Sequence, residues 1–206
     1  MPVLPTRAIA IAILVVATGA GPAKQSWEST VKPEVKLTVL PHTALVEVDG
    51  QARTRGFLSL DVADPKRTFR VRVSAEGFET AEAVVEAGRV ADRAFFLALR
   101  PAGFGSSGHI DPGDASAMAK AASALLRAGR ADDAAEYAEQ SLEAGRTPLA
   151  NRVLGDVWRR RGDRDKATRY YAMYLSLADN PPDAAEIRAW LTQARGGDIT
   201  VPEKSP

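Results

Sequence analysis

Arg152, Asp156 and Arg159 have the residue types and spacing most suggestive of binding chemistry. Residues three and four apart are neighbours on a helix surface, so these three side chains are expected on one helical face. Two guanidinium groups beside a carboxylate suit an acidic or polar peptide. The alternative is a charged face that only keeps the protein in solution.

Groups for catalysis or metal binding are scarce. The 206 residues include no cysteine, which excludes disulfides, thiolate ligands, thiol nucleophiles and the acylated cysteine of a lipoprotein. The two histidines, His42 and His109, are far apart in sequence and are expected in a turn and in a linker. The β-rich third of the chain shows no paired carboxylates and no phosphate-binding glycine loop. We therefore predict a non-enzymatic protein without catalytic residues, cofactor or metal ion.

Charge is balanced overall but not locally. The chain has 27 basic and 26 acidic residues, a net charge of +1, so we expect no nucleic-acid partner. Residues 146–174 carry eight basic and three acidic side chains, whereas residues 114–145 carry three basic and six acidic ones. This polarity favours an oriented partner or self-association.

The N-terminus is typical of a secretory signal peptide, expected over residues 1–23. Arg7 precedes a ten-residue apolar run, which as a helix would extend about 15 Å, half the thickness of a bilayer core. Small residues follow, with cleavage expected after Ala20 or Ala23. The alternative is an uncleaved membrane anchor. Residues 24–34 are expected to be a polar lead-in.

Residues 35–101 are predicted to form an all-β antiparallel sandwich. Six short segments have β-branched or alternating apolar residues, separated by turn signals about every ten residues. In one of them Phe69, Val71 and Val73 point to one side, and Asp49-Gly50 marks a tight hairpin turn. The six expected strands are 35–40, 44–48, 57–62, 69–73, 81–86 and 94–99.

This region resembles the PEGA domain family. The resemblance rests on a Pro-x-x-Ala opening, a V-x-V-D-G hairpin, a basic and aromatic strand and a Gly-aromatic pair, found here at 41–44, 46–50, 69–73 and 77–78. The opening tetrapeptide has His42-Thr43 in place of Glu-Gly, and Arg55-Gly56-Phe57-Leu58 replaces the family's Gly-x-Thr-Pro turn. The resemblance implies a scaffold that engages an envelope component.

The last part of the chain is predicted to be helical. Residues 102–114, rich in glycine, serine and proline, are expected to be a flexible linker. The alanine-rich sequence from 115 to 195 then has helix-stop signals at Gly129, Gly145 and Gly162. Residues 196–206 are expected to be a disordered tail. The expected helices are 115–128, 131–144, 148–161, 163–178 and 184–194.

A motif recurs within the helices. Gly129-x4-Ala134-x2-Tyr137 reappears 33 residues later from Gly162, and Leu154-Gly155-x2-Trp158 precedes the second copy. The pattern resembles the tetratricopeptide (TPR) repeat, although Asn151 stands where an aromatic residue is usual. A final helix with Ile187, Trp190 and Leu191 would cap the array. By this resemblance, the residues that contact a partner protein are Ser123, Leu126, Arg127, Arg152, Asp156 and Arg159.

Together these features predict an exported adaptor or scaffold of the bacterial cell envelope. It would lie in the periplasm or at the outer-membrane periphery, or be anchored to the inner membrane by its first segment, its only contact with membrane. The helical array would bind a protein, and the β-domain would bind an envelope component such as a polymer. The alternatives are an accessory subunit of an envelope enzyme or of a secretion or motility machine, and a module that binds peptidoglycan or another polysaccharide.

Overall fold

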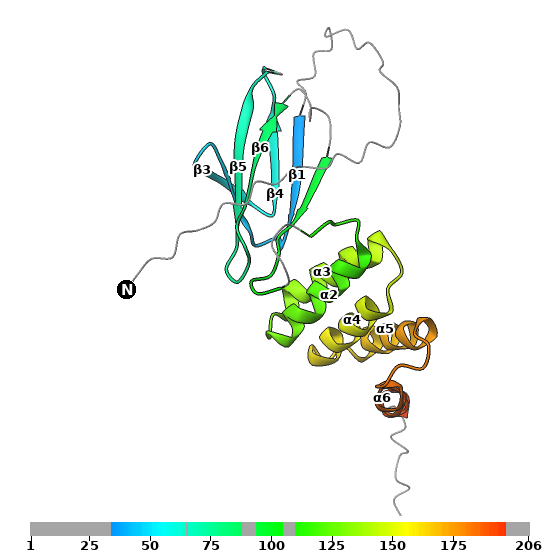
Figure 1. Ribbon diagram of the computed structural model, residues 1–206. Helices are drawn as coiled ribbons and strands as arrows, with labels where there is room; N and C mark the ends of the chain where they lie inside the picture. Colours follow the sequence, from blue (N-terminus) through cyan, green and yellow to red (C-terminus); the bar gives the residue numbers. More distant parts are fainter. Residues whose placement is uncertain (1–33, 65, 88–93, 105–109, 197–206) are drawn as a thin grey trace, which may run out of the picture. The chain divides into compact units, whose positions relative to one another are not determined.

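The computed structural model describes residues 34–64, 66–87, 94–104 and 110–196 (Figure 1). The chain divides into two compact units between Asp111 and Pro112. The first contains the β-strands and the second the described helices, so the expected order of a β region followed by a helical region is confirmed. The expected signal peptide, all but the last residue of the lead-in, His109 and residues 197–206 lie outside the described residues.

The first unit has seven described strands in two sheets. One sheet has the order β4-β1-β7 and the other β3-β2-β5-β6. Every pair is antiparallel except β1 and β7, which run parallel. The strands are β1 (Glu34–Leu40), β2 (Leu45–Val48), β3 (Gln51–Arg55), β4 (Phe57–Asp61), β5 (Thr68–Ser74), β6 (Ala81–Glu86) and β7 (Ala94–Ala98).

Two details of the strand prediction were wrong. The sheets are not purely antiparallel, because the chain crosses from β6 in one sheet to β7 in the other and brings β7 beside β1 in the same direction. Strand β3 was not predicted. Its sequence, Gln51–Arg55, has no apolar alternation, since it is an edge strand with mostly exposed side chains.

The core of the first unit lies between the sheets, as the alternation of β5 predicted. Phe69, Val71 and Val73 are buried, whereas Arg70 and Arg72 are exposed on the opposite face. Val35 and Leu58 of the other sheet are also buried. Because successive side chains of a strand point to opposite faces, this pattern fixes which face of each sheet is inside.

Two turns depend on backbone in the left-handed region. Asp49 (φ 51°) and Gly50 (φ 78°) join β2 to β3, the combination that a two-residue hairpin turn requires. The Asp49 carboxylate accepts the Arg70 backbone N–H at 2.9 Å and so ties the turn to β5. Between β3 and β4, a Cβ added to Gly56 would lie 2.5 Å from the His42 carbonyl oxygen, so the close approach of these segments needs a glycine.

The second unit has five described helices in two matched pairs and a final helix. Helices α2 (Ala115–Arg127) and α3 (Ala131–Ala144) have the same lengths as α4 (Pro148–Arg160) and α5 (Arg164–Leu177), which begin and end 33 residues later. Each pair packs together, α4 also contacts α2 and α3, and α6 (Ala184–Gly196) contacts α5. No helix among the described residues is long and apolar enough to cross a bilayer.

The turns within the two pairs have the same hydrogen bonds. After α2, Gly129 has φ 81° and its N–H donates to the Leu126 carbonyl, while the Arg130 N–H donates to the Leu125 carbonyl. After α4, Gly162 has φ 79°, and it and the following residue make the equivalent bonds. This is the Schellman ending of a helix, which favours glycine because of its positive φ.

Candidate functional site

Helix α4 places Arg152, Asp156 and Arg159 on one face, as their spacing predicted. Gly155 lies among them and lets the Tyr171 ring of α5 pack directly against the α4 backbone. A Cβ added to Gly155 would lie 2.4 Å from Tyr171 Cδ1, so no larger residue fits without a shift. Close approach of α4 and α5 therefore brings Tyr171 of α5 into contact with the charged face of α4.

Arg152 is held between two carboxylates. Its Nε donates to Asp183 Oδ2 at 2.5 Å, and its guanidinium also forms an ion pair with Asp156. Tyr171 donates its hydroxyl to Asp156 Oδ1 at 2.6 Å, and Tyr174 donates to Asp183 Oδ1 at 2.7 Å. We call these five residues the arginine network. It joins α4, α5 and the residue before α6, and it satisfies each carboxylate with one arginine and one tyrosine.

Burial and pairing shift the pKa values in the arginine network. Burial raises the pKa of Tyr171 and Tyr174 to about 12 each, helped by the hydrogen bonds to Asp156 and Asp183. Burial alone would raise the pKa of Asp183, but the hydrogen bonds from Arg152 and Tyr174 outweigh it and lower that pKa. Near neutral pH Tyr171 and Tyr174 are therefore neutral hydrogen-bond donors, and Asp183 is ionised.

Arg159 interacts with the last helix. Its Nη1 lies 3.4 Å from Glu186 Oε1, and its guanidinium lies 5.7 Å from the centre of the Trp190 ring. Ile187 is buried with Tyr171 and Tyr174, and Trp190 and Leu191 pack against them. Helix α6 therefore covers this face of the second pair.

The six predicted contact residues do not share one environment. Arg152 and Asp156 are half-buried within the arginine network, and Leu126 is buried, with its carbonyl accepting a hydrogen bond from Arg160 at 3.3 Å. Ser123 is half-buried, whereas Arg127 and Arg159 are exposed. Most of this set thus makes helix-to-helix contacts, and two arginines remain accessible.

Sequence reasoning missed the members of the arginine network outside α4. Tyr171, Tyr174 and Asp183 were not among the predicted contact residues. The available signal was an acidic residue directly after Pro181-Pro182, where a helix begins. Nothing in the spacing connects Asp183 with Arg152, 31 residues earlier, because that pairing depends on how α6 folds back.

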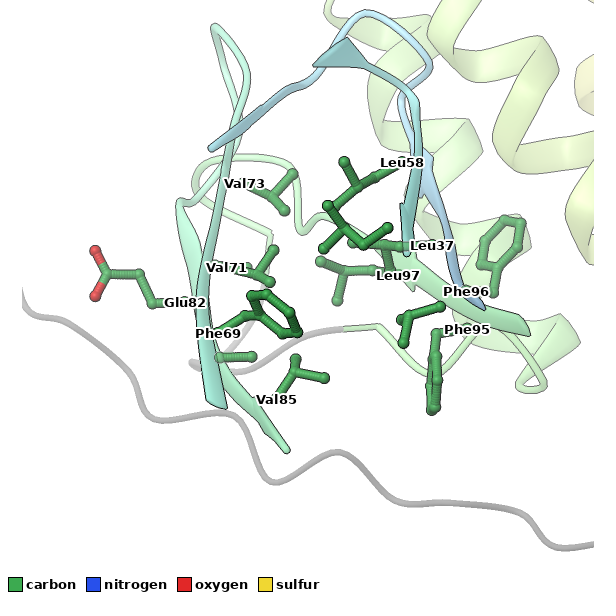
Figure 2. Close-up of a pocket in the computed structure, with 14 residues that line it drawn as sticks. Leu37, Leu58, Phe69, Val71, Val73, Glu82, Val85, Phe95, Phe96 and Leu97 are labelled. Atoms are coloured by element: carbon green, nitrogen blue, oxygen red, sulfur yellow. The ribbon is translucent and has the colours of Figure 1, made fainter. Parts of the chain in front are cut away.

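The first unit contains an apolar cavity of about 80 Å³ between its sheets (Figure 2). Leu37, Leu58 and Leu97 line it from one sheet, and residues of β5 and β6 line it from the other. Glu82, drawn in the same view, points away from the cavity. Since the wall is hydrocarbon, the cavity is part of the packed core and offers no group for chemistry.

The described residues show no clustered metal ligands. His42 is exposed in the turn after β1, and His109 lies outside the described residues. Within the part of the chain that the structure describes, no three histidine, aspartate or glutamate side chains are arranged to hold a metal ion.

Comparison with known proteins gives no further identification. No protein-family model matches the sequence, and no curated protein matches it significantly.

Proposed function

We propose that this protein is a non-enzymatic adaptor of the bacterial cell envelope and that its helical unit binds a partner protein, as TPR arrays do. The observation that supports this most is the equal length and 33-residue spacing of the helix pairs, with the same glycine turn in each. Stacked helix pairs of about this period are typical of TPR arrays, which present extended binding surfaces.

The surface proposed for the partner includes Arg127 and Arg159. Both are exposed, and they lie near the C-terminal ends of α2 and α4. Arg152 and Asp156 stabilise this surface indirectly, because the arginine network holds α4 against α5 and the residue before α6. The partner would present acidic or polar groups to the two arginines.

For the first unit we propose a PEGA-like scaffold that contacts an envelope component. Two observations support it: a two-sheet fold, and a tight hairpin at Asp49-Gly50 in the position that the family's motif gives it. Export through the N-terminal segment would bring both units to the same compartment.

Site-specific photo-crosslinking tests the adaptor proposal. A photoreactive phenylalanine analogue would replace Arg127 in the full-length protein, expressed in its native bacterium. We expect a discrete protein adduct at this position. The matched control is the same replacement at Arg188, an exposed residue of α6. Equal adducts at Arg127 and Arg188, or none at Arg127, would contradict the proposal.

One observation keeps a polysaccharide-binding function as the second candidate. Phe57, at the start of β4, is 48% exposed, and sugar sites use exposed aromatic rings. Retention of the protein on purified peptidoglycan, lost in Phe57→Ala, would favour this function. An accessory role in an envelope enzyme or machine would be recognised by the identity of the protein crosslinked at Arg127.

A further inference from the structure

A groove beside α5 lies on a different face from the one covered by α4 and α6. Ala167, Tyr171 and Tyr174 of α5 form the covered face and are buried. The groove has a volume of about 560 Å³. We call it the basic groove, and its lining residues are Leu142, Arg146, Asn151, Lys166, Arg169, Tyr170, Met173 and Leu177.

The charged residues that line the basic groove are all cations. Arg146 comes from the turn after α3, and Lys166 and Arg169 come from the first half of α5. Lys166 forms an ion pair with Asp163, at an Nζ–Oδ2 distance of 3.5 Å. Arg146 and Arg169 make no ion pair or hydrogen bond with another described residue. Glu139 acts electrostatically on Tyr170 but does not line the groove.

The apolar residues that line the basic groove are partly open to solvent. Met173 is 50% exposed, one of three large apolar side chains in the described residues with such exposure. Leu142, Tyr170 and Leu177 are half-buried beside it. Methionine adapts its shape to different partners, which suits an apolar contact surface.

We propose that the basic groove binds an acidic, amphipathic segment of a partner protein. The negative charge of the segment would complement two unpaired arginines and a lysine of the groove. Its apolar side chains would cover Met173 and Leu177. Along α5, Lys166 to Leu177 extends about 16 Å, roughly three turns of a docked helix. Because apolar and cationic side chains line one groove, the site suits an amphipathic protein segment better than it suits the flat surface of a lipid bilayer. This inference rests on the proposed function only in taking the partner to be a protein.

Peptide binding to the full chain, measured by fluorescence anisotropy, tests the inference. The probe is a labelled 16-residue helical peptide with leucine at i, i+3 and i+7 and glutamate at the flanking positions. A second peptide has lysine in place of every glutamate. Because electrostatic attraction supplies part of the affinity, we expect the acidic peptide to bind at least about tenfold more tightly, with a preference that weakens as salt rises.

Two groove variants and one control variant locate the binding. We expect Arg146→Glu with Arg169→Glu, and separately Met173→Asp, to weaken binding of the acidic peptide at least about tenfold. The control, Lys120→Glu with Arg188→Glu, removes two exposed cations outside the groove and should keep binding within about twofold. All these side chains are exposed, and circular dichroism of each variant verifies its folding.

Three results would overturn the inference. They are no binding of the acidic peptide to the unaltered protein, equal binding by the groove variants, or binding to phosphatidylglycerol vesicles without binding to the peptide. If one of these is found while the Arg127 crosslink persists, the adaptor proposal stands and only the groove assignment fails.

Discussion

The two helix pairs have the same backbone arrangement but different buried side chains at equivalent positions. Their helices have equal lengths, and their turns make the same hydrogen bonds. At positions 33 residues apart, however, Ala119 of α2 corresponds to Arg152 of α4, and Ala138 of α3 corresponds to Tyr171 of α5. At these positions the first pair has buried alanines, whereas the second pair has two members of the arginine network.

The difference follows from what covers each pair. The first pair is covered by α4, which is itself a member of a matched pair. Buried alanines of the first pair allow a close apolar contact with α4. The second pair is covered by α6, which begins after Asp183 and carries Glu186 in its first turn. A buried polar network is stable only when each member has its hydrogen-bond partner. The packing of α6 on the second pair therefore depends more on particular residues than the packing of α4 on the first pair does. Exchanging residues between equivalent positions tests this comparison.

The largest effect is expected from Arg152→Ala, which gives α4 the residue that α2 has at the same position. Two half-buried carboxylates would lose their cation. Removing one partner of a buried ion pair costs about 3–5 kcal/mol, and we expect about 2–3 kcal/mol here because these groups are partly exposed. Urea unfolding of the full chain measures the loss. Arg188→Ala is the control, and a loss equal to that of the control would contradict this account.

A smaller loss is expected from Gly155→Ala, which makes α4 like α2 at Ala122. The added methyl group would overlap the Tyr171 ring, and overpacking costs about 1–3 kcal/mol, partly offset by alanine's better helix propensity of about 1 kcal/mol. We expect a net loss of unfolding free energy in thermal or urea unfolding. In a Tyr171→Ala background the same change should become neutral or stabilising, and a loss unchanged by that background would argue against the contact.

Acid should weaken the second pair through Asp183. Its folded-state pKa is lowered, so its contribution to stability is complete above the unfolded-state value near 4 and is lost as pH falls through the folded-state pKa. We expect the unfolding free energy to fall as the pH drops below about 4, and to fall less in Asp183→Asn. If the unaltered protein and Asp183→Asn lose stability equally as the pH falls, Asp183 does not cause the loss.

The smallest effect distinguishes the starts of the pairs. Asp114 caps α2 by accepting the Ala117 N–H at 2.9 Å, whereas Thr147 makes no such bond at the start of α4. Asp114→Ala should lower the unfolding free energy by about 1 kcal/mol, the usual value of an N-cap. Ser116→Ala, an exposed change in the same turn, should have almost no effect. If the two changes are equivalent, the capping bond contributes nothing.

Local patterns were sufficient to predict most elements. Glycine stops and alanine-rich runs gave all five described helices to within two residues at the ends, and alternation gave six of the seven described strands. The exception, β3, has no apolar period because its side chains are mostly exposed. The three α4 residues were correctly placed on one face, but their inward contacts were not predicted.

Local signals specify the five described helices, six of the seven described strands, the order of the two regions and the 33-residue spacing, because caps, turns and apolar periods act between residues close in the chain. Three features could not be predicted from local signals: β7 runs parallel to β1, Arg152 pairs with Asp183, and α5 has one covered and one open face. These features depend on how distant segments meet, and a charged residue gives the same sequence signal whether it faces solvent or a carboxylate on another helix.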